Sequence, residues 1–288
     1  MQLINCTVPK EHEIYLLSDI HVGVVQFHKA AFKKVIDEIK DNPKAKVVFL
    51  GDLAEGRPSN HKFFSYKTAD PDLVLPVQQY QWFEETITPI KDKVITLMDG
   101  NHDFPLAETY GEQIQPMCDR LGITFGTFSC VITFKHDKKQ LYKIFCHHGS
   151  GTIRSGARET YRRPFNMLMS MYNKLEPLMS DCLGKFMAHC HLLQFLPPGL
   201  MQMGVGELHL LNDGTKIEQN YIKKHARSRI IHPYDVWYGC TGSFQKQFVL
   251  GVSTYGERKM YRPLEMGYLK IISTPEGDDI KSIRKVIV

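Results

Sequence analysis

Val94-Ile95-Thr96-Leu97-Met98-Asp99-Gly100-Asn101-His102-Asp103 is the stretch that decides the fold. Apolar and β-branched residues fill its first half, which is typical of a buried strand. The run stops at a glycine, and three side chains that can bind a metal follow at once. The pattern predicts a strand that ends in a functional loop.

The same pattern occurs four more times along the chain. Each time a short apolar run is followed by Asp or His: Ile14–Leu17 leads to Asp19 and His21, Val47–Leu50 to Asp52, Tyr142–Cys146 to His147 and His148, and Gly184–Ala188 to His189 and His191. Open α/β sheets bind ligands at the carboxyl ends of their strands. We therefore expect the five loops to meet along one edge of a sheet and to form one cluster of metal ligands.

The overall composition is that of an ordinary globular protein. The chain has 288 residues, 43% of them hydrophobic and 23% charged, which is enough to bury a sizeable core. A net charge of +5 permits a polyanionic partner without requiring one. We expect one domain over residues 1–288, with the site motifs within residues 19–191 and a β-rich part at residues 192–288.

Several features favour a cytoplasmic protein with no membrane contact. No apolar run approaches the roughly 18 residues that a membrane span needs. The first residues lack the basic and apolar regions of a secretory signal. The seven cysteines are scattered without a CxxC pair, which favours reduced thiols. Nothing in the pattern indicates the oligomeric state.

Helical spacing of apolar residues predicts four helices, within residues 32–39, 77–87, 114–121 and 164–180. The first three alternate with strands, which predicts a largely parallel sheet with crossover helices. The segment from Glu55 to Pro76 has no period and predicts an irregular loop beside the site. Asn212-Asp213-Gly214 predicts a hairpin turn.

Asp, Asn and imidazole ligands together suit manganese, iron or zinc. Two such ions roughly 3.5–4 Å apart are the usual arrangement for displacement at phosphorus. There the metals polarise the phosphoryl oxygens and lower the pKa of a shared water.

Together, the five motifs resemble the signature of the calcineurin-like metallophosphoesterases. The matching residues are Asp19-x-His21, Gly51-Asp52, Gly100-Asn101-His102-Asp103, His148-Gly149 and His189-x-His191, in the family's order. The resemblance implies an α/β fold, a four-layer αββα sandwich with two mixed sheets. It also implies hydrolysis of a phosphate ester without a covalent phospho-enzyme. One departure is Ala188, which stands where the family usually has Gly.

The resemblance also implies roles for individual residues. Asp19, His21 and His191 would hold one metal, Asn101, His148 and His189 the other, and Asp52 would bridge them. His148 is preferred over His147 because it precedes Gly149. His102 would stabilise the transition state or act as general acid, oriented by Asp103 or Glu55. The expected cofactors are two divalent ions, with manganese preferred and iron, zinc, nickel or magnesium as alternatives.

Arg154, Arg158, Arg162 and Arg163 follow the His147-His148 loop closely. A solvated surface and contact with further phosphates of a polymer are both open for them, because a guanidinium can bind phosphate bidentately. The cluster and the basic balance favour a phosphodiesterase or nuclease acting on nucleic acid, DNA or RNA, or on nucleotides. Such a core resembles that of the SbcD-like DNA repair exonucleases.

Two other functions remain as alternatives. One is a phosphomonoesterase or a small-molecule phosphodiesterase, for instance of cyclic nucleotides. The other is a non-catalytic scaffold of the same fold. The intact set of ligand residues argues against the scaffold.

Overall fold

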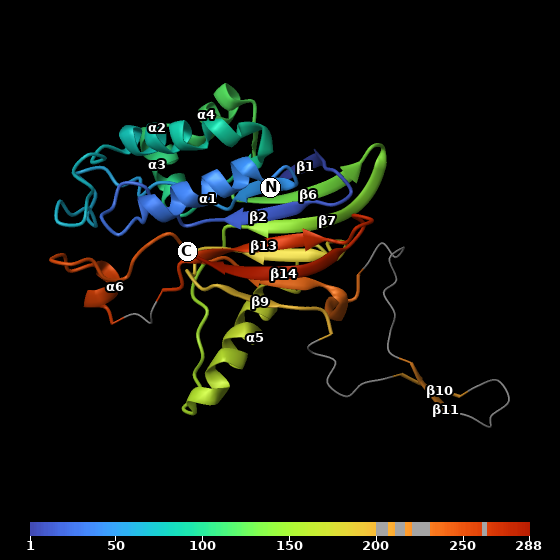
Figure 1. Ribbon diagram of the computed structural model, residues 1–288. Helices are drawn as coiled ribbons and strands as arrows, with labels where there is room; N and C mark the ends of the chain where they lie inside the picture. The colour runs from blue at the N-terminus through green and yellow to red at the C-terminus, as the bar shows by residue number, and fades with distance from the viewer. Residues whose placement is uncertain (200–206, 211–216, 221–230, 261–263) are drawn as a thin grey trace.

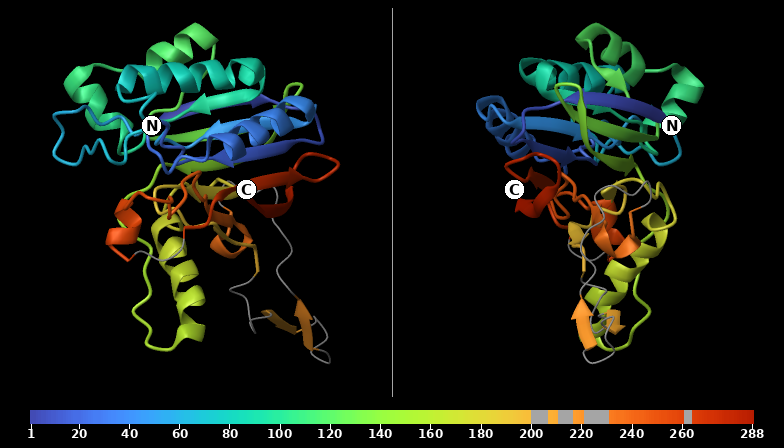
Figure 2. Two further views of the ribbon diagram at one scale, coloured as in Figure 1. Left: turned by 60° about the vertical axis from the view of Figure 1, so that its left-hand side comes forward. Right: turned by 90° about the vertical axis from the view of Figure 1, so that its right-hand side faces the viewer.

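Two six-stranded mixed sheets form the centre of the molecule (Figures 1 and 2). The computed structural model describes residues 1–199, 207–210, 217–220, 231–260 and 264–288. We call the two sheets the β2 sheet and the β7 sheet after a central strand of each. Helices cover their outer faces, so the predicted four-layer sandwich is confirmed.

The β2 sheet contains the strands that precede the first three site motifs. Its strand order is β14-β13-β2-β3-β4-β5. Strands β2 to β5 are parallel, as predicted, whereas β13 runs antiparallel to both β2 and β14. The bounds are Glu13–Leu17 for β2, Ala45–Phe49 for β3, Val94–Leu97 for β4, Thr124–Phe125 for β5, Gly267–Ser273 for β13 and Ile280–Ile287 for β14.

The β7 sheet contains the strands that precede the last two motifs, and its order is β1-β6-β7-β8-β12-β9. Its parallel pairs are β1 with β6, β7 with β8, and β8 with β12. Strand β1 was not expected from the sequence. The bounds are Gln2–Thr7 for β1, Ser129–His136 for β6, Lys139–His147 for β7, Gly184–Met187 for β8, Gln194–Leu196 for β9 and Trp237–Cys240 for β12.

The predicted helices lie on the outer faces of the two sheets. The apolar faces of α1 (Lys29–Asp41), α2 (Pro76–Ile87) and α4 (Ile114–Leu121) share one core with the β2 sheet. Helix α5 (Arg163–Leu175) packs its Met171 and Leu175 on the β7 sheet. Helix α4 ends at Gly122, whose φ of 70° is the left-handed conformation that glycine favours.

Two short helices were not predicted, α3 (Asp103–Tyr110) and α6 (Tyr255–Arg258). Helix α3 buries only Asp103 and Leu106, so its sequence carries no apolar period to detect. Strands β10 (Glu207–Leu210) and β11 (Ile217–Asn220) pair in antiparallel fashion. The predicted Asn212-Asp213-Gly214 turn lies outside the described residues. No helix among the described residues is long and apolar enough to cross a membrane.

The core between the sheets is closed by glycines that pack on one aromatic ring. Phe186 of β8 is fully buried there, beside Ile144 of β7 and Leu269 of β13. A Cβ at Gly184 would lie 2.6 Å from Cε2 of Phe186, and one at Gly239 would lie 2.8 Å from Cδ1 of the same ring. Both glycines are therefore required by close packing.

We expect Gly184→Ala to lower the free energy of unfolding by about 1–3 kcal/mol, because the added methyl group overpacks a closed core. Adding Phe186→Leu should remove part of this penalty, since it shortens the side chain that the methyl group meets. Chemical denaturation of the two single variants and the double variant measures the coupling. Gly156→Ala is the matched control because a Cβ there meets nothing within 4 Å. Strictly additive effects of the two core substitutions would contradict this account.

Candidate metal centre

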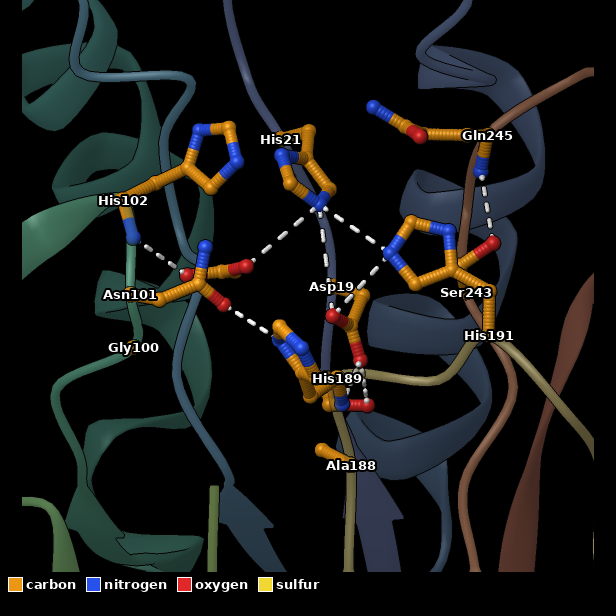
Figure 3. A network of polar contacts seen from close by, with 12 residues as sticks. Asp19, His21, Gly100, Asn101, His102, Ala188, His189, His191, Ser243 and Gln245 are labelled. Carbon is orange, nitrogen blue, oxygen red and sulfur yellow. Dashed lines mark hydrogen bonds and ion pairs between the residues drawn. The ribbon is translucent and has the colours of Figure 1, made fainter. Parts of the chain in front are cut away.

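The five predicted loops do meet in one place, but they come from two sheets rather than one. Figure 3 shows Asp19, His21, Asn101, His189 and His191 converging there. Asp19, His21, Asp52 and Asn101 follow strands of the β2 sheet, whereas His148, His189 and His191 follow strands of the β7 sheet. The single sheet edge expected from the sequence is therefore wrong. The cluster spans neighbouring ends of two stacked sheets, which lets its ligands approach from opposite sides.

Five of these residues have a left-handed backbone, which side chains other than glycine adopt rarely. Their φ angles are 51° at Asp19, 50° at His21, 51° at Asp52, 69° at His189 and 51° at His191. Backbone hydrogen bonds between neighbouring loops hold this conformation, since the amides of Ile20 and His21 both donate to the carbonyl of Asp52. Strain of this kind is concentrated at functional sites and requires support from the surrounding structure.

One half of the cluster consists of Asp19, His21 and His191 (Figure 3). Nε2 of His191 lies 3.2 Å from Oδ1 of Asp19 and 3.4 Å from Nε2 of His21. The other carboxylate oxygen of Asp19 accepts hydrogen bonds from the Ser18 hydroxyl and the His189 amide. Ser18 and His189 thus fix the carboxylate with Oδ1 facing the two imidazoles.

The other half consists of Asp52, His148 and His189, joined by Asn101. Nε2 of His148 lies 3.0 Å from Oδ1 of Asn101 and 3.4 Å from Oδ2 of Asp52. The Asn101 oxygen also contacts Nδ1 of His189. Oδ2 of Asp52 lies 3.7 Å from Nε2 of His21 as well, so this carboxylate lies between the two halves.

Neighbouring groups orient the imidazoles toward the cluster. Nδ1 of His148 donates to the carbonyl of Leu50 at 2.7 Å, which leaves Nε2 facing Asp52. Nδ1 of His21 lies 3.2 Å from Oε2 of Glu55, which leaves its Nε2 facing Asp19. Partners of this kind fix the tautomer of a metal-binding histidine and raise its basicity.

Backbone packing also restricts the Asp52 carboxylate. Its Oδ1 accepts a hydrogen bond from the amide of His102 at 2.8 Å. A Cβ at Gly100 would collide with this oxygen, so the glycine of the Gly-Asn-His-Asp motif is needed for close approach.

His102 lies at the rim of the cluster and is held by two groups. Its Nδ1 is 3.0 Å from the carbonyl of Glu55, and its Nε2 is 3.2 Å from a guanidinium nitrogen of Arg57. Arg57 also pairs with the Glu55 carboxylate at 3.0 Å. Sequence reasoning missed Arg57, although its position five residues after Asp52 in the same loop was a usable signal.

Glu55, rather than Asp103, contacts the His102 imidazole. The Asp103 carboxylate accepts hydrogen bonds from the amides of Gly100 and Leu53 and, at 2.6 Å, from the hydroxyl of Tyr80. It therefore stabilises the loop backbone and the start of α3. The expectation that Asp103 orients His102 finds no support in these contacts.

The donor set fits divalent cations. Oδ1 of Asp19 is fully buried and accepts no hydrogen bond, although imidazole nitrogens surround it. A buried carboxylate oxygen that accepts no hydrogen bond is costly unless positive charge lies beside it. A cation bound by Asp19, His21 and His191 would supply that charge.

The histidines carry part of this charge in the metal-free protein. Burial opposes ionisation of Asp52, but the imidazoles around it, His148 first, hold the pKa of its carboxyl well below the usual range. Burial likewise opposes protonation of His148, yet Asp52 and Asp19 outweigh it and raise the pKa of His148 to about 10. His148 is thus protonated at neutral pH when no metal is bound.

Four other residues singled out in the sequence lie apart from the cluster. Arg154, Arg158 and Arg162 are exposed, and no hydrogen bond or ion pair joins them to a residue of the candidate centre among the described contacts. His147 packs its ring on Phe128 and Phe145, and its Nδ1 accepts a hydrogen bond from the Gly149 amide. The cluster thus contains His148 and excludes His147.

Comparisons with known proteins agree with the site. The family model described as calcineurin-like phosphoesterase matches residues 12–206. Curated proteins gave no significant match. The chain therefore belongs to the calcineurin-like phosphoesterase family and is a metallophosphoesterase.

Solved structures with a similar course of the chain are remote in sequence. Vps29 from Chaetomium thermophilum is 12% identical, with a TM-score of 0.38 over 96% of this chain and 97% of that one. A single mutant of Vps29 from Entamoeba histolytica is 12% identical, with a TM-score of 0.39 over 96% and 99%. A metallophosphoesterase from Sphaerobacter thermophilus is 14% identical, with a TM-score of 0.38 over 95% and 88%. The family assignment depends on none of these three.

We expect manganese binding at pH 7 to release a proton, because His148 must become neutral to offer Nε2 as a ligand. Affinity should then rise with pH by up to about tenfold per unit for each proton released. Titration calorimetry in buffers of different ionisation enthalpy measures the number of protons. His147→Gln should release as many as the wild type, whereas His148→Gln should release fewer. Equal release by both variants would exclude His148 as a ligand.

Proposed function

We propose that this metallophosphoesterase is a phosphodiesterase that cleaves nucleic acid or nucleotides. Asp19, His21 and His191 would hold one divalent ion, Asn101, His148 and His189 the second, and Asp52 would bridge them. When bound, such ions polarise the phosphoryl oxygens and lower the pKa of a water that attacks phosphorus. The seven side chains are all present and converge, which argues against a scaffold that has lost its chemistry.

The charge around the centre is the observation that favours a diester over a monoester. Arg57 is the only one of the described lysines and arginines that contacts His102 or Glu55, and Glu55 already balances it. A phosphomonoester is close to a dianion at neutral pH, with a second pKa near 6, whereas a diester carries one negative charge. Because Glu55 already pairs with Arg57, this arginine offers little positive charge to a second phosphate oxygen. The centre therefore suits a diester, with its single negative charge, better than a monoester dianion.

His102 is placed to assist the leaving oxygen. Its Nδ1 faces the carbonyl of Glu55, so Nε2 is the nitrogen that faces Arg57 and the open rim. Donation to a leaving group requires a proton on Nε2, and Arg57 must therefore move off this atom when substrate binds. The Glu55 carboxylate lies 3.5 Å from Nδ1 and restricts the orientation of the ring. Glu55 acts here as a positioning residue.

Arg154, Arg158 and Arg162 could contact substrate only if the substrate is a polymer that extends beyond the metal centre. The far end of α5, at Leu175, lines a small cavity with His147 and Gly149, beside the centre. The helix has 13 residues, so Arg162, which directly precedes it, is about 20 Å further along it. We assign Arg154, Arg158 and Arg162 to phosphates distant from the cleaved one.

Two finer assignments complete the proposal. The mixed nitrogen and oxygen donors suit manganese, with iron, zinc, nickel or magnesium as alternatives. All seven cysteines are free, and five of them are buried, which fits a reducing cytoplasm.

The test of this function compares substrates on one metal-loaded preparation. We expect protein reconstituted with manganese to hydrolyse bis-aryl phosphate and labelled single- or double-stranded DNA or RNA, with little turnover of mono-aryl phosphate. Arg158→Ala combined with Arg162→Ala should weaken binding of long strands and lower its dependence on salt. Turnover confined to mono-aryl phosphate would contradict the diesterase assignment. An unchanged dependence of binding on salt would show that the two arginines are solvated and do not contact substrate.

We expect His102→Ala to leave the metal content unchanged and to slow the hydrolysis of esters with poor leaving groups most, by about a hundredfold or more. Activated aryl esters need less protonation of the departing oxygen and should lose less. Steady-state kinetics over a series of leaving groups, with metal analysis of each preparation, measures both effects. Equal losses across the series would contradict a general-acid role.

A further inference from the structure

The loop between β3 and α2 carries an exposed tip that is rich in basic and aromatic residues. We call residues 57–67 of this segment the Phe63 loop. It contains Arg57, Lys62 and Lys67 with no Asp or Glu, together with Phe63, Phe64 and Tyr66. In Figure 1 this segment projects beyond the carboxyl ends of the β2-sheet strands, on the side where the metal-binding loops gather.

A single guanidinium connects the Phe63 ring to the candidate centre. Arg57 lies 3.2 Å from Nε2 of His102, and the same guanidinium lies over the Phe63 ring at 5.7 Å from its centroid. Lys62 also approaches this ring, with Nζ 4.8 Å from the centroid. One guanidinium therefore separates the aromatic ring from the imidazole that we assign to the cleaved ester.

Core packing does not explain these rings. Phe63 is 59% exposed and Tyr66 is 74% exposed. Neither side chain belongs to an apolar cluster of the described residues. Large apolar rings kept in solvent beside an enzymatic centre indicate a binding surface more often than rings scattered singly do.

The loop is tied to the body of the protein on both sides of this tip. The Tyr110 hydroxyl of α3 donates to Asn60 at 3.0 Å. The Val25 amide donates to the carbonyl of Thr68, and Lys29 pairs with Asp70 at 2.6 Å. The rings are thus presented from an anchored loop, which limits the entropy lost when a ligand binds.

We propose that the Phe63 loop is a base-stacking subsite for a single nucleic-acid strand whose cleaved phosphate lies at the metal centre. This proposal rests on the diesterase function and names its substrate class. Every base has a flat face that stacks on an aromatic ring, and cations beside the ring meet the flanking phosphates. Lys62 supplies such a charge beside Phe63, and Arg57, although paired with Glu55, lies beside the same ring. A strand without bases would bind only through attraction between its phosphates and these cations.

Binding of two strands with equal charge separates stacking from electrostatics. The probes are labelled phosphorothioate strands of about eight nucleotides, one of thymidine and one wholly abasic, with affinity measured by fluorescence anisotropy on manganese-loaded protein. We expect the wild type to bind the thymidine strand about tenfold more tightly than the abasic one. Phe63→Ala should bring this ratio close to one, and Phe63→Trp should keep it.

Tyr161→Ala is the matched control. Tyr161 lies just before α5, is 73% exposed and has the Arg162 guanidinium 5.6 Å from its ring centroid, so it has the same chemistry as Phe63 at another place. This variant should keep the wild-type ratio. A ratio of one in the wild type, an unchanged ratio in Phe63→Ala, or a ratio lost in Tyr161→Ala alone would each overturn the proposal.

The two proposals fail separately. If bis-aryl phosphate is hydrolysed and both strands bind equally, the diesterase function stands and the stacking subsite is wrong. If no ester is hydrolysed but the ratio depends on Phe63, the loop binds bases and the diesterase function is wrong.

Discussion

Two buried carboxylates, Asp19 and Asp52, require positive charge close to them, and the rest of the site follows from this constraint. Both are almost wholly excluded from water. Isolated buried anions are too costly to persist, so they must be paired, protonated or bound to metal. In the metal-free protein protonated His148 meets part of this need, since Asp52 and Asp19 raise its pKa to about 10 against the effect of burial. Asp19 also raises the pKa of His191. A cation can replace the proton on His148, which makes metal binding and proton release one process.

The fold supplies this arrangement by bringing the ends of two stacked sheets together. The strands end close to the centre, and five of the candidate ligand residues adopt left-handed φ angles that turn their side chains toward it. The strain is supported by hydrogen bonds between adjacent loops and by Gly51 and Gly100, where no side chain would fit. The favourable packing of the sheet core thus compensates for the strained backbone conformation at the site.

Much of this could be predicted from the sequence because the motifs are local. Each candidate ligand follows a β-rich run within a few residues, and the order of the motifs carried the family resemblance. The division of the ligands between two sheets could not be predicted, since strand order depends on pairings such as β7 with β8 that join segments far apart in the chain. Helix α3 lacks an apolar period. The roles of Glu55, Asp103 and Arg57 depend on side-chain contacts across loops, which spacing does not encode.

The central claim is that Asp52 lies between two metal ions held by residues from both sheets. Anomalous diffraction from crystals grown with manganese tests it most directly. The account predicts two peaks, one among Asp19, His21 and His191 and one among Asn101, His148 and His189, with the Asp52 carboxylate in contact with both. Peaks elsewhere, or a single peak that Asp52 does not contact, would contradict it.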